Sequence, residues 1–521
     1  MLNKSFTEKQ LFVFEVLIIV AFCFSPLLFN NPYRLNIFLS WEGAYRMSIG
    51  QIPFRDFSLP MGYGHWIIPA LFFKIFGPYM YTLIKAQVFI NLISVFSFRA
   101  ILNKVGVAPP LILLSVLVFC FSYVSFNFWP WYNHLVIVLQ FVAIYFALVA
   151  IFSTQLWKVL TGLALAAIFI LYAFFTKQDG GALGLMIIYG MLAYDAFMSR
   201  YWSKLLIFTG FVLVFSAILI LPLLQYDFLY WFNYGQSPHD SRLVLMDFLN
   251  QLVGWAYWEK FFLLILVLIF LDKLRIGYAF LHNKKDFLFW FISTAMVVEA
   301  MIIQVTSDEP DKGEVFFYAF AFAYTVSHLR LSFDFSKLGY LFVSIVLITF
   351  WWTGIYWRNI KRLVADKPVI VEKMENKERE KYRLATEYKT LDRLYLAEST
   401  LEGIKQIKSM DVFRQNKDVK VLNMTELTSL AYEVPFTPLT NQPMWFHQGV
   451  SIFQKEVDEF CVKIRNHEYD VVLFETIPES EVINFFPMDV KQCLDEVYQH
   501  EFTFLAPRTP EESFIHVYTK K

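Results

Sequence analysis

The 521-residue sequence is short of the features by which soluble enzymes and nucleic-acid-binding proteins are recognised. It has only four cysteines, and its net charge at pH 7 is zero. It shows no repeat of fixed period, no low-complexity segment and no basic patch, which argues against nucleic acid as a partner. Its polar C-terminal part lacks a glycine-rich phosphate loop, a nucleophile elbow and a Cys/His cluster with metal-ligand spacing.

Apolar and aromatic residues are abundant. They make up 57% and 19% of the chain, and the mean hydropathy is positive, which is typical of a membrane protein. A helix that crosses a bilayer needs about 20 apolar residues. The sequence therefore predicts a polytopic α-helical membrane protein with eleven transmembrane helices, near residues 10–29, 79–101, 109–127, 133–152, 157–175, 181–198, 204–224, 258–272, 286–306, 313–328 and 337–356. The apolar stretch 65–76 is short for a crossing, so we expect it to lie in the interface or to re-enter.

Lysine and arginine in short loops predict the orientation of the chain, because such loops face the cytoplasm. Arg34, Arg46 and Arg55 oppose this trend, but they share a loop with Glu42 and Asp56. An odd number of helices then places the N-terminus inside and the C-terminal segment outside. The loop residues on which this rests are Lys4, Lys9, Arg99, Lys104, Lys158, Arg200, Lys204, Lys273, Arg275, Lys284, Lys285, Arg330 and Lys337.

The chain divides by composition into a membrane domain, 1–357, and a soluble extracytoplasmic domain, 358–521. The second begins with a polar, helix-prone run at 373–408. Short apolar runs predict strands at 419–423, 470–475, 502–505 and 514–518, and a helical pattern covers 451–467, so we expect an α/β domain.

The two ends of the chain raise two further questions. The N-terminal apolar run at 11–29 is too long for a cleavable signal and lacks a cleavage site, so it is expected to be a retained first helix. Cys461 and Cys493 share the soluble domain, but spacing alone leaves open whether they pair.

Candidate functional residues gather between the first two helices. The sequence reads Trp-Glu-Gly-Ala-Tyr at 41–45 and Gly-Gln-Ile-Pro-Phe-Arg-Asp-Phe at 50–57. Gly50 closes a short segment, 44–49, that suits a helix lying along the membrane surface. Glu42 would then either reach a lipid-borne substrate or carry the negative charge at the N-terminus of this helix.

This loop resembles the first outer loop of GT-C superfamily glycosyltransferases. The resemblance rests on the runs at 41–45 and 50–57, on Pro-Met-Gly-Tyr-Gly at 60–64 and on Phe-Lys-Ile-Phe-Gly at 73–77. It extends to Lys177 and Gln178 after the fifth helix and, through architecture alone, to the rest of the chain. The sequence departs from the family at Trp41, where the pattern usually has Asp. Trp41 would instead stack on a sugar ring or serve as an interface aromatic.

The resemblance implies inverting transfer of a sugar from a polyprenyl-phosphate donor to an acceptor hydroxyl on the outer side. A carboxylate takes the proton of the acceptor, for which Glu42 is the first candidate and Asp56 the second. Fixed cations stabilise the leaving phosphate, and the candidates are Arg55, Lys177 and Arg46. A divalent metal, Mg²⁺ or Mn²⁺, held by Glu42 and Asp56 is a further option.

Other residues are weaker candidates for substrate binding, and each has a structural alternative. Asp179 is as well suited to cap a helix, and Lys177 to extend toward the interface. Asp308 and Glu309 lie in an acidic loop that also suits a solvated turn, and His134 follows aromatics typical of an interfacial belt. The remaining candidates are Tyr45, Gln178 and His65.

Two other functions compete with an enzyme. A lipid-linked sugar flippase would carry ionisable residues inside the membrane, for which Glu299 and Lys85 are the candidates. The second competing function is that of an inactive, glycosyltransferase-like partner protein. The main argument for it is Trp41, which stands where the family pattern usually has Asp. The aromatic and isoleucine-rich composition favours a bacterial inner or plasma membrane protein.

Overall fold

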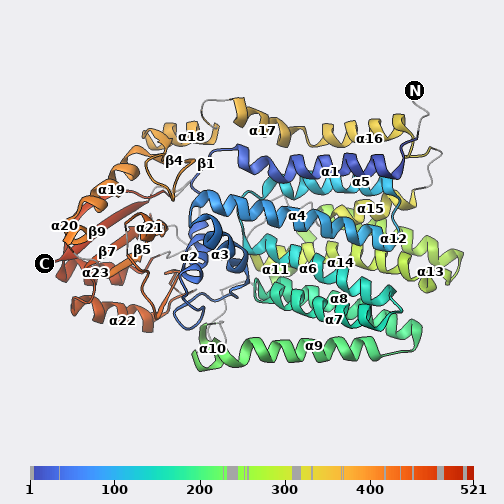
Figure 1. The fold of residues 1–521 in the computed structure, drawn as a ribbon, viewed down its shortest axis with the longest axis horizontal. Helices are drawn as coiled ribbons and strands as arrows, with labels where there is room; N and C mark the ends of the chain where they lie inside the picture. The colour runs from blue at the N-terminus through green and yellow to red at the C-terminus, as the bar shows by residue number, and fades with distance from the viewer. Residues whose placement is uncertain are drawn as a thin grey trace. The chain divides into compact units, whose positions relative to one another are not determined.

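The computed structural model describes the chain except for short segments, and it consists mainly of helices (Figure 1). Two compact units are present, and each is described by itself. Unit 1 comprises residues 1–27, 87–222 and 240–359, and unit 2 comprises residues 28–86, 223–239 and 360–521. The residues outside the description are 1–4, 35, 227, 232–244, 251–252, 255–256, 308–317, 330–332, 365–366, 368, 416–417, 435, 449–450, 478–485 and 508–512.

Unit 1 is a bundle of long apolar helices that run nearly parallel or antiparallel to one another (Figure 1). Helix α4 continues into it from unit 2, and α17 leaves it. The helices are α1 (Glu8–Phe24), α4 (Met80–Val105), α5 (Pro109–Ser122), α6 (Tyr132–Phe152), α7 (Leu156–Phe174), α8 (Gln178–Ser199), α9 (Ser203–Ile220), α11 (Leu245–Asn250), α12 (Tyr257–Ile276), α13 (Ala279–His282), α14 (Lys284–Ser307), α15 (Ala319–His328), α16 (Leu338–Trp351) and α17 (Thr353–Val364).

Eight helices among the described residues are long and apolar enough to cross a membrane. They match eight of the eleven predicted segments, from 10–29 through 204–224 and then 286–306. The other three differ. α12 has charged residues in its first and last turns, and α16 is followed after a 68° bend by a second helix. α15 covers the end of the predicted segment 313–328, whose first five residues, 313–317, lie outside the described residues. The total of eleven is therefore not confirmed.

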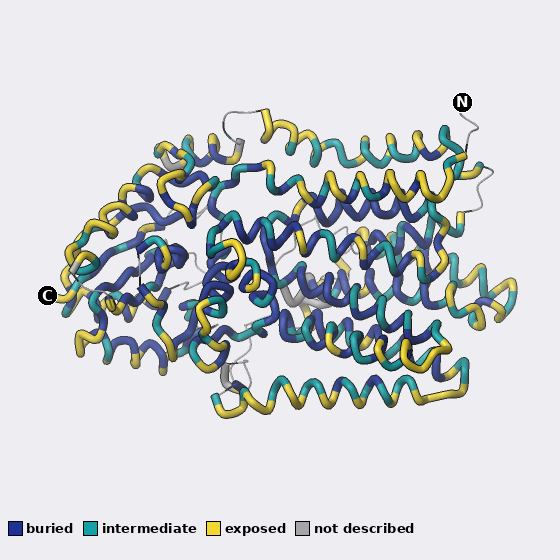
Figure 2. Tube along the Cα trace, viewed as in Figure 1, coloured by how far each residue is buried: buried dark blue, intermediate teal, exposed yellow. Residues whose placement is uncertain are grey.

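The burial pattern of unit 1 explains why its helices are apolar all round (Figure 2). Helix α5 is buried along most of its length, with stacked Phe98 and Phe119 at 4.7 Å between ring centroids. In contrast, α9 exposes large side chains such as Leu206, Leu213 and Ile218. An apolar helix surface of this kind suits contact with lipid.

Unit 2 is built on a four-stranded sheet with the order β5-β7-β9-β8. β5 and β7 are parallel, and the other two pairs are antiparallel. Every strand predicted in the tail is present, as β5 (Val421–Met424), β7 (Val471–Thr476), β8 (Tyr498–Leu505) and β9 (Phe514–Lys520). The helix predicted at 451–467 is α22 (Gln454–Arg465), and the Cys461–Cys493 disulfide joins it to α23 (Met488–Val497).

The segment between α1 and α4 belongs to unit 2, and its short strands pair with strands of the C-terminal part of the chain. β1 (Asn31–Pro32) lies parallel to β4 (Leu394–Ala397), and β2 (Phe57–Ser58) lies parallel to β6 (Gln442–Pro443). β3 (Tyr382–Leu384) completes the first of these sheets, so strands interrupt the run 373–408 that was predicted to be helical. The remaining helices of unit 2 are α2 (Ile37–Ser48), α3 (Gly64–Phe76), α10 (Phe228–Trp231), α18 (Val369–Glu378), α19 (Glu398–Ser409), α20 (Asp411–Gln415) and α21 (Leu430–Glu433).

Candidate functional site

Helix α2 carries the first group of predicted site residues and starts earlier than the sequence indicated. It begins at Ile37 rather than near residue 44, so Glu42 lies in mid-helix and does not cap its N-terminus. Gly43 allows α3 to approach closely, since a Cβ there would lie 2.2 Å from Trp66. The indole N–H of Trp66 donates to the Leu39 carbonyl at 2.7 Å, which fixes α3 against α2.

Glu42 forms a buried ion pair with Arg46, one helical turn away. Arg46 Nε and Nη2 donate to Glu42 Oε1 at 2.8 and 2.6 Å, and Arg46 Nη1 donates to the Leu439 carbonyl at 2.7 Å and to Gln51. The exposed fractions of the two side chains are 10% for Glu42 and 2% for Arg46. Burial raises the pKa of Glu42, and the guanidinium offsets part of that effect.

Arg55 and Asp56 form a second ion pair in the same loop, and this one is accessible. Arg55 Nε and Nη2 donate to the two Asp56 oxygens at 2.9 and 2.7 Å, and the Ile52 backbone N–H donates to Asp56 Oδ2 at 2.7 Å. These hydrogen bonds, the one from Arg55 foremost, lower the pKa of Asp56 and keep its carboxylate ionised. The Arg55 side chain is 41% exposed.

A cavity of about 310 Å³ opens beside Arg55. Phe54, Tyr226 and Asn441 are among the residues that line it. Phe54 has φ of 65°, an uncommon conformation for a residue other than glycine. Its ring meets Phe228 edge to face at 4.9 Å, and its N–H donates to the Phe57 carbonyl. Packing thus holds a strained backbone next to Arg55 and Asp56, two of the predicted site residues, as is common at functional sites.

A second pocket of about 560 Å³ lies beside Tyr45. Its lining includes Tyr432, Phe436 and Lys420, and the Tyr45 and Tyr432 rings meet edge to face at 6.2 Å. The Trp41 ring stacks on the Tyr45 ring, with 4.7 Å between the ring centroids. Trp41 is fully buried, and its indole N–H donates a hydrogen bond to the Pro78 carbonyl. Of the two aromatic residues predicted to bind substrate, Tyr45 thus lines a pocket, whereas the position of Trp41 favours packing.

The predicted residues of the membrane part lie in unit 1. Lys177 precedes α8 and forms an ion pair with Asp179 at 3.1 Å, Gln178 begins the helix, and His134 lies in the first turn of α6. The Lys177 side chain is only 9% exposed. Asp179 lies in the first turn of α8, so it is not the N-cap residue.

The sequence analysis did not identify Gln140, a residue of α6 that contacts both α8 and α14. Its Nε2 donates to Glu299 Oε1 at 2.7 Å and also contacts the Gly180 carbonyl. Glu299 is 1% exposed, so the amide satisfies part of its hydrogen-bonding capacity. A glutamine inside an apolar helix was the available signal.

The other predicted site residues are not gathered at these positions. His65 is fully buried in α3, and burial lowers its pKa to about 3, which keeps the ring neutral. Asp308 and Glu309 lie outside the described residues. No group of three His, Cys, Asp or Glu side chains with metal-binding geometry occurs in the part of the chain that the structure describes. Glu42 and Asp56 are each engaged by an arginine, so these two carboxylates do not fit a metal site.

Comparison with known proteins gives a match at the level of structure. No protein-family model and no curated protein sequence matches the chain. The crystal structure of ArnT from Cupriavidus metallidurans bound to undecaprenyl phosphate matches with a TM-score of 0.53 and 11% sequence identity, over 97% of both chains. The apo structure of the same ArnT covers the same shares at 11% identity, with a TM-score of 0.49. The chain therefore shares the fold of this ArnT structure.

Proposed function

We propose that this protein is an integral membrane glycosyltransferase that moves a sugar from a polyprenyl-phosphate donor to an acceptor hydroxyl, with inversion at the anomeric carbon. The observation that carries the proposal is the ArnT-like fold over 97% of the chain. The eight apolar helices are consistent with a lipid-borne donor. The loop motif around Arg55 and Asp56, which lies at an accessible cavity, supplies the chemical groups that such a transfer needs.

In the proposed reaction, the acceptor oxygen attacks the anomeric carbon while the bond from that carbon to the donor phosphate oxygen breaks. The acceptor proton passes to a carboxylate, and polyprenyl phosphate leaves with the bonding electrons. A hydroxyl is a poor nucleophile at neutral pH, so removal of its proton lowers the barrier. Positive charge near the leaving phosphate stabilises the transition state further.

Asp56 is the carboxylate that we assign as the general base. It is ionised, and it lies beside the cavity through its bond to Arg55. Burial raises the pKa of Glu42, which suits a base better. However, the Glu42 side chain is only 10% exposed, and its partner Arg46 is 2% exposed, so an acceptor has little access to this carboxylate. We assign the Glu42-Arg46 pair to positioning the loop, and Glu42 as the base is the alternative that the experiment tests.

Arg55 is the proposed phosphate ligand in unit 2, because its guanidinium is exposed and planar. Lys177 is the proposed ligand from unit 1. Arg46 is assigned no direct phosphate contact because it is buried and its donors are engaged. No step is assigned to a metal ion, since the carboxylates that would hold it are paired with arginines.

We further propose that unit 2 faces the outside of the cell, and that the membrane is a bacterial inner or plasma membrane. The Cys461-Cys493 disulfide supports an oxidising compartment. Lysine and arginine gathered at the end of α12 and the start of α14 support a cytoplasmic position for the short connection between these helices. A cysteine placed near the C-terminus should therefore react with an impermeant thiol reagent in intact cells.

The test of the enzyme proposal is sugar transfer by the purified full-length protein from a panel of polyprenyl-phosphate sugars. Asp56→Asn should lower kcat by about 10²- to 10⁴-fold, the usual contribution of a general base, while donor binding persists. Glu402→Gln is the matched control, because Glu402 is an exposed acid of unit 2 whose ion pair within the described part of the chain is with Lys405. Loss of turnover in Glu42→Gln with unchanged thermal stability, and normal turnover in Asp56→Asn, would reassign the base to Glu42.

A flippase is the second candidate function, and Glu299 is the observation that favours it. A carboxyl buried among membrane helices is a recognised feature of transport pathways. Wild-type protein that binds lipid-linked sugar without transferring it, and loses translocation in Glu299→Gln, would replace the enzyme proposal with this one.

A further inference from the structure

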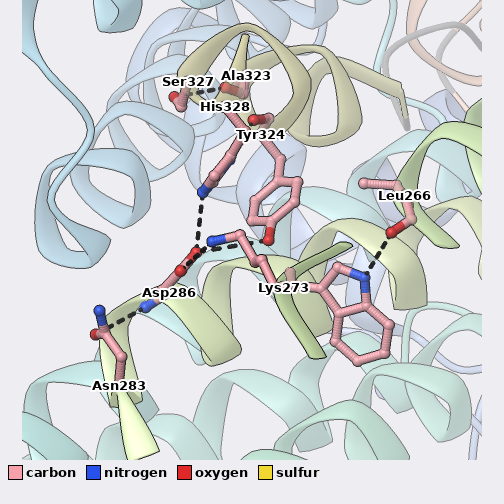
Figure 3. Close-up of polar contacts among 9 residues, drawn as sticks. Leu266, Lys273, Asn283, Asp286, Ala323, Tyr324, Ser327 and His328 are labelled. Atoms are coloured by element: carbon pink, nitrogen blue, oxygen red, sulfur yellow. Dashed lines mark hydrogen bonds and ion pairs between the residues drawn. The ribbon is translucent and has the colours of Figure 1, made fainter. Parts of the chain in front are cut away.

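A polar pocket of about 430 Å³ opens in unit 1, away from every residue assigned above. It lies where α4 ends, where α5 and α14 begin and where α15 ends. Its polar lining includes Asn283, Lys285, Asp286 and His328. The cluster around Asp286 is drawn in Figure 3.

Asp286 contacts the side chains of Lys273 and His328, and Asp286 and His328 both line the pocket. Lys273 Nζ contacts Asp286 Oδ2, and His328 Nε2 lies 3.0 Å from Asp286 Oδ1 (Figure 3). His328 Nδ1 lies 2.7 Å from the Tyr324 carbonyl, which can only accept a hydrogen bond, so Nδ1 carries a proton. On its other side, Nε2 faces the Asp286 carboxyl group, so the ring lies between a carbonyl oxygen and a carboxyl oxygen. These two contacts fix the orientation of the His328 ring at the pocket.

Lys285 brings a positive charge to the pocket lining. It is exposed, and none of the described residues forms an ion pair with it. Its stem passes close to Gly106, where a Cβ would lie 3.5 Å from Lys285 Cδ. Gly106 has φ of 90°, a conformation that suits glycine at this turn after α4. The pocket lining thus combines the cation of Lys285 with the polar side chains of Asn283 and His328, while the charge of Asp286 is paired with Lys273.

The pocket lies at the opposite end of unit 1 from Lys177. Helix α8 begins directly after Lys177, and Asp195, near its other end, accepts a hydrogen bond from Lys284 at 2.5 Å. The intervening 17 helical residues span about 26 Å, close to the thickness of a bilayer core. Large apolar side chains, Ile276 and Tyr278, are exposed beside this end, at 68% and 74%. The pocket therefore belongs to a surface that suits a membrane interface.

We propose that this pocket binds the phosphate of an anionic phospholipid head group in the leaflet at this end of unit 1. Basic pockets between helices at the cytoplasmic side of a membrane are suited to such head groups, because the phosphate neutralises them and the acyl chains stay in the bilayer. Lys285 supplies the free cation, and His328 is held by Asp286 beside it. The proposal uses only residues of unit 1, so it stands independently of the proposed activity.

The experiment is a lipid titration of the full-length detergent-solubilised protein, followed by native mass spectrometry, with phosphatidylglycerol and phosphatidylcholine as probes. Phosphatidylglycerol should bind in preference, and Lys285→Ala should weaken it about five-fold, the usual effect of one basic residue at an anionic surface. His328→Gln should weaken it as well. Lys158→Ala is the matched control, because Lys158 is also an exposed lysine at a helix end predicted to face the cytoplasm.

Three results would overturn the proposal. If Lys158→Ala and Lys285→Ala weaken the binding of phosphatidylglycerol equally, the lipid is attracted to the positive charge of the protein surface in general and not to this pocket. Equal binding of phosphatidylcholine and phosphatidylglycerol would remove the need for a negative charge. Glycerol 3-phosphate that binds as tightly as the lipid would assign the pocket to a soluble phosphate ester; failure to compete supports the lipid.

Discussion

Two carboxylate-arginine pairs lie in one loop of unit 2, and their contact distances are nearly the same. Arg46 approaches Glu42 to 2.6 Å, and Arg55 approaches Asp56 to 2.7 Å. Their surroundings differ: the first pair is buried and bonded to the tail through the Leu439 carbonyl, whereas the arginine of the second is 41% exposed. We therefore expect the buried Glu42-Arg46 pair to hold the structure together and the exposed Arg55-Asp56 pair to remain open to a ligand.

The largest expected effect comes from breaking the buried pair. Arg46→Ala leaves the Glu42 carboxylate without its partner inside the protein and removes the donor to Leu439. Removal of one member of a buried pair typically costs about 3 to 5 kcal/mol. We expect a clear fall in the apparent Tm of the purified protein, measured by scanning fluorimetry in detergent.

Arg55→Ala is the matched control for this comparison, since it removes the same type of side chain from the exposed pair. Its apparent Tm should stay within the experimental scatter of the wild type, because solvent screens an exposed pair. The double variant Glu42→Leu/Arg46→Leu should recover part of the stability lost in Arg46→Ala, because it leaves no unpaired charge. Equal Tm losses in Arg46→Ala and Arg55→Ala would refute the distinction between the two pairs.

A smaller effect is expected from moving α2 without touching either pair. In Gly43→Ala the new methyl group would lie 2.2 Å from Trp66, so the two helices must separate or Trp66 must move. Overpacking of this kind costs about 1 to 3 kcal/mol. The apparent Tm should fall, and a Tm equal to that of the wild type would show that the packing of α2 on α3 does not hold the buried pair.

Gly210→Ala serves as the control for that substitution. Gly210 lies on α9, and a Cβ there meets no other atom within 4 Å. Alanine also has the higher helix propensity, so this variant should be as stable as the wild type or slightly more stable.

Local sequence patterns predicted much of the fold. Runs of about 20 apolar residues located eight helices, and the short apolar runs of the tail located β5, β7, β8 and β9. Pairings between distant segments left no such signal. β1 and β2 are two residues long, and each pairs with a strand more than 300 residues away, so the sequence could not indicate that this loop belongs to unit 2.

The candidate site was predicted in its residues but not in its environments. The motif identified Glu42, Arg46, Arg55 and Asp56 together, yet it gave no reason to separate a buried pair from an exposed one. Glutamate and arginine four residues apart were a usable signal for the first pair, because that spacing places them on one helix face. The signal was missed because α2 was predicted to begin after Glu42 rather than at Ile37.

The smallest effect, and the sharpest comparison, is the opposite response of the two carboxylates to pH. Burial raises the pKa of Glu42 above 4.5, so its contribution to stability is present below that pH and is lost as the pH rises. The hydrogen bonds from Arg55 lower the pKa of Asp56 below 3.8, so its contribution is present above that pH and is lost as the pH falls. Apparent Tm values between pH 3 and 7 should show these slopes as differences from the wild type, with Glu42→Gln gaining relative stability as the pH rises and Asp56→Asn losing it. Parallel slopes in the two variants would mean that both carboxylates occupy the same kind of environment, and the division of the loop into a structural pair and a reactive pair would no longer hold.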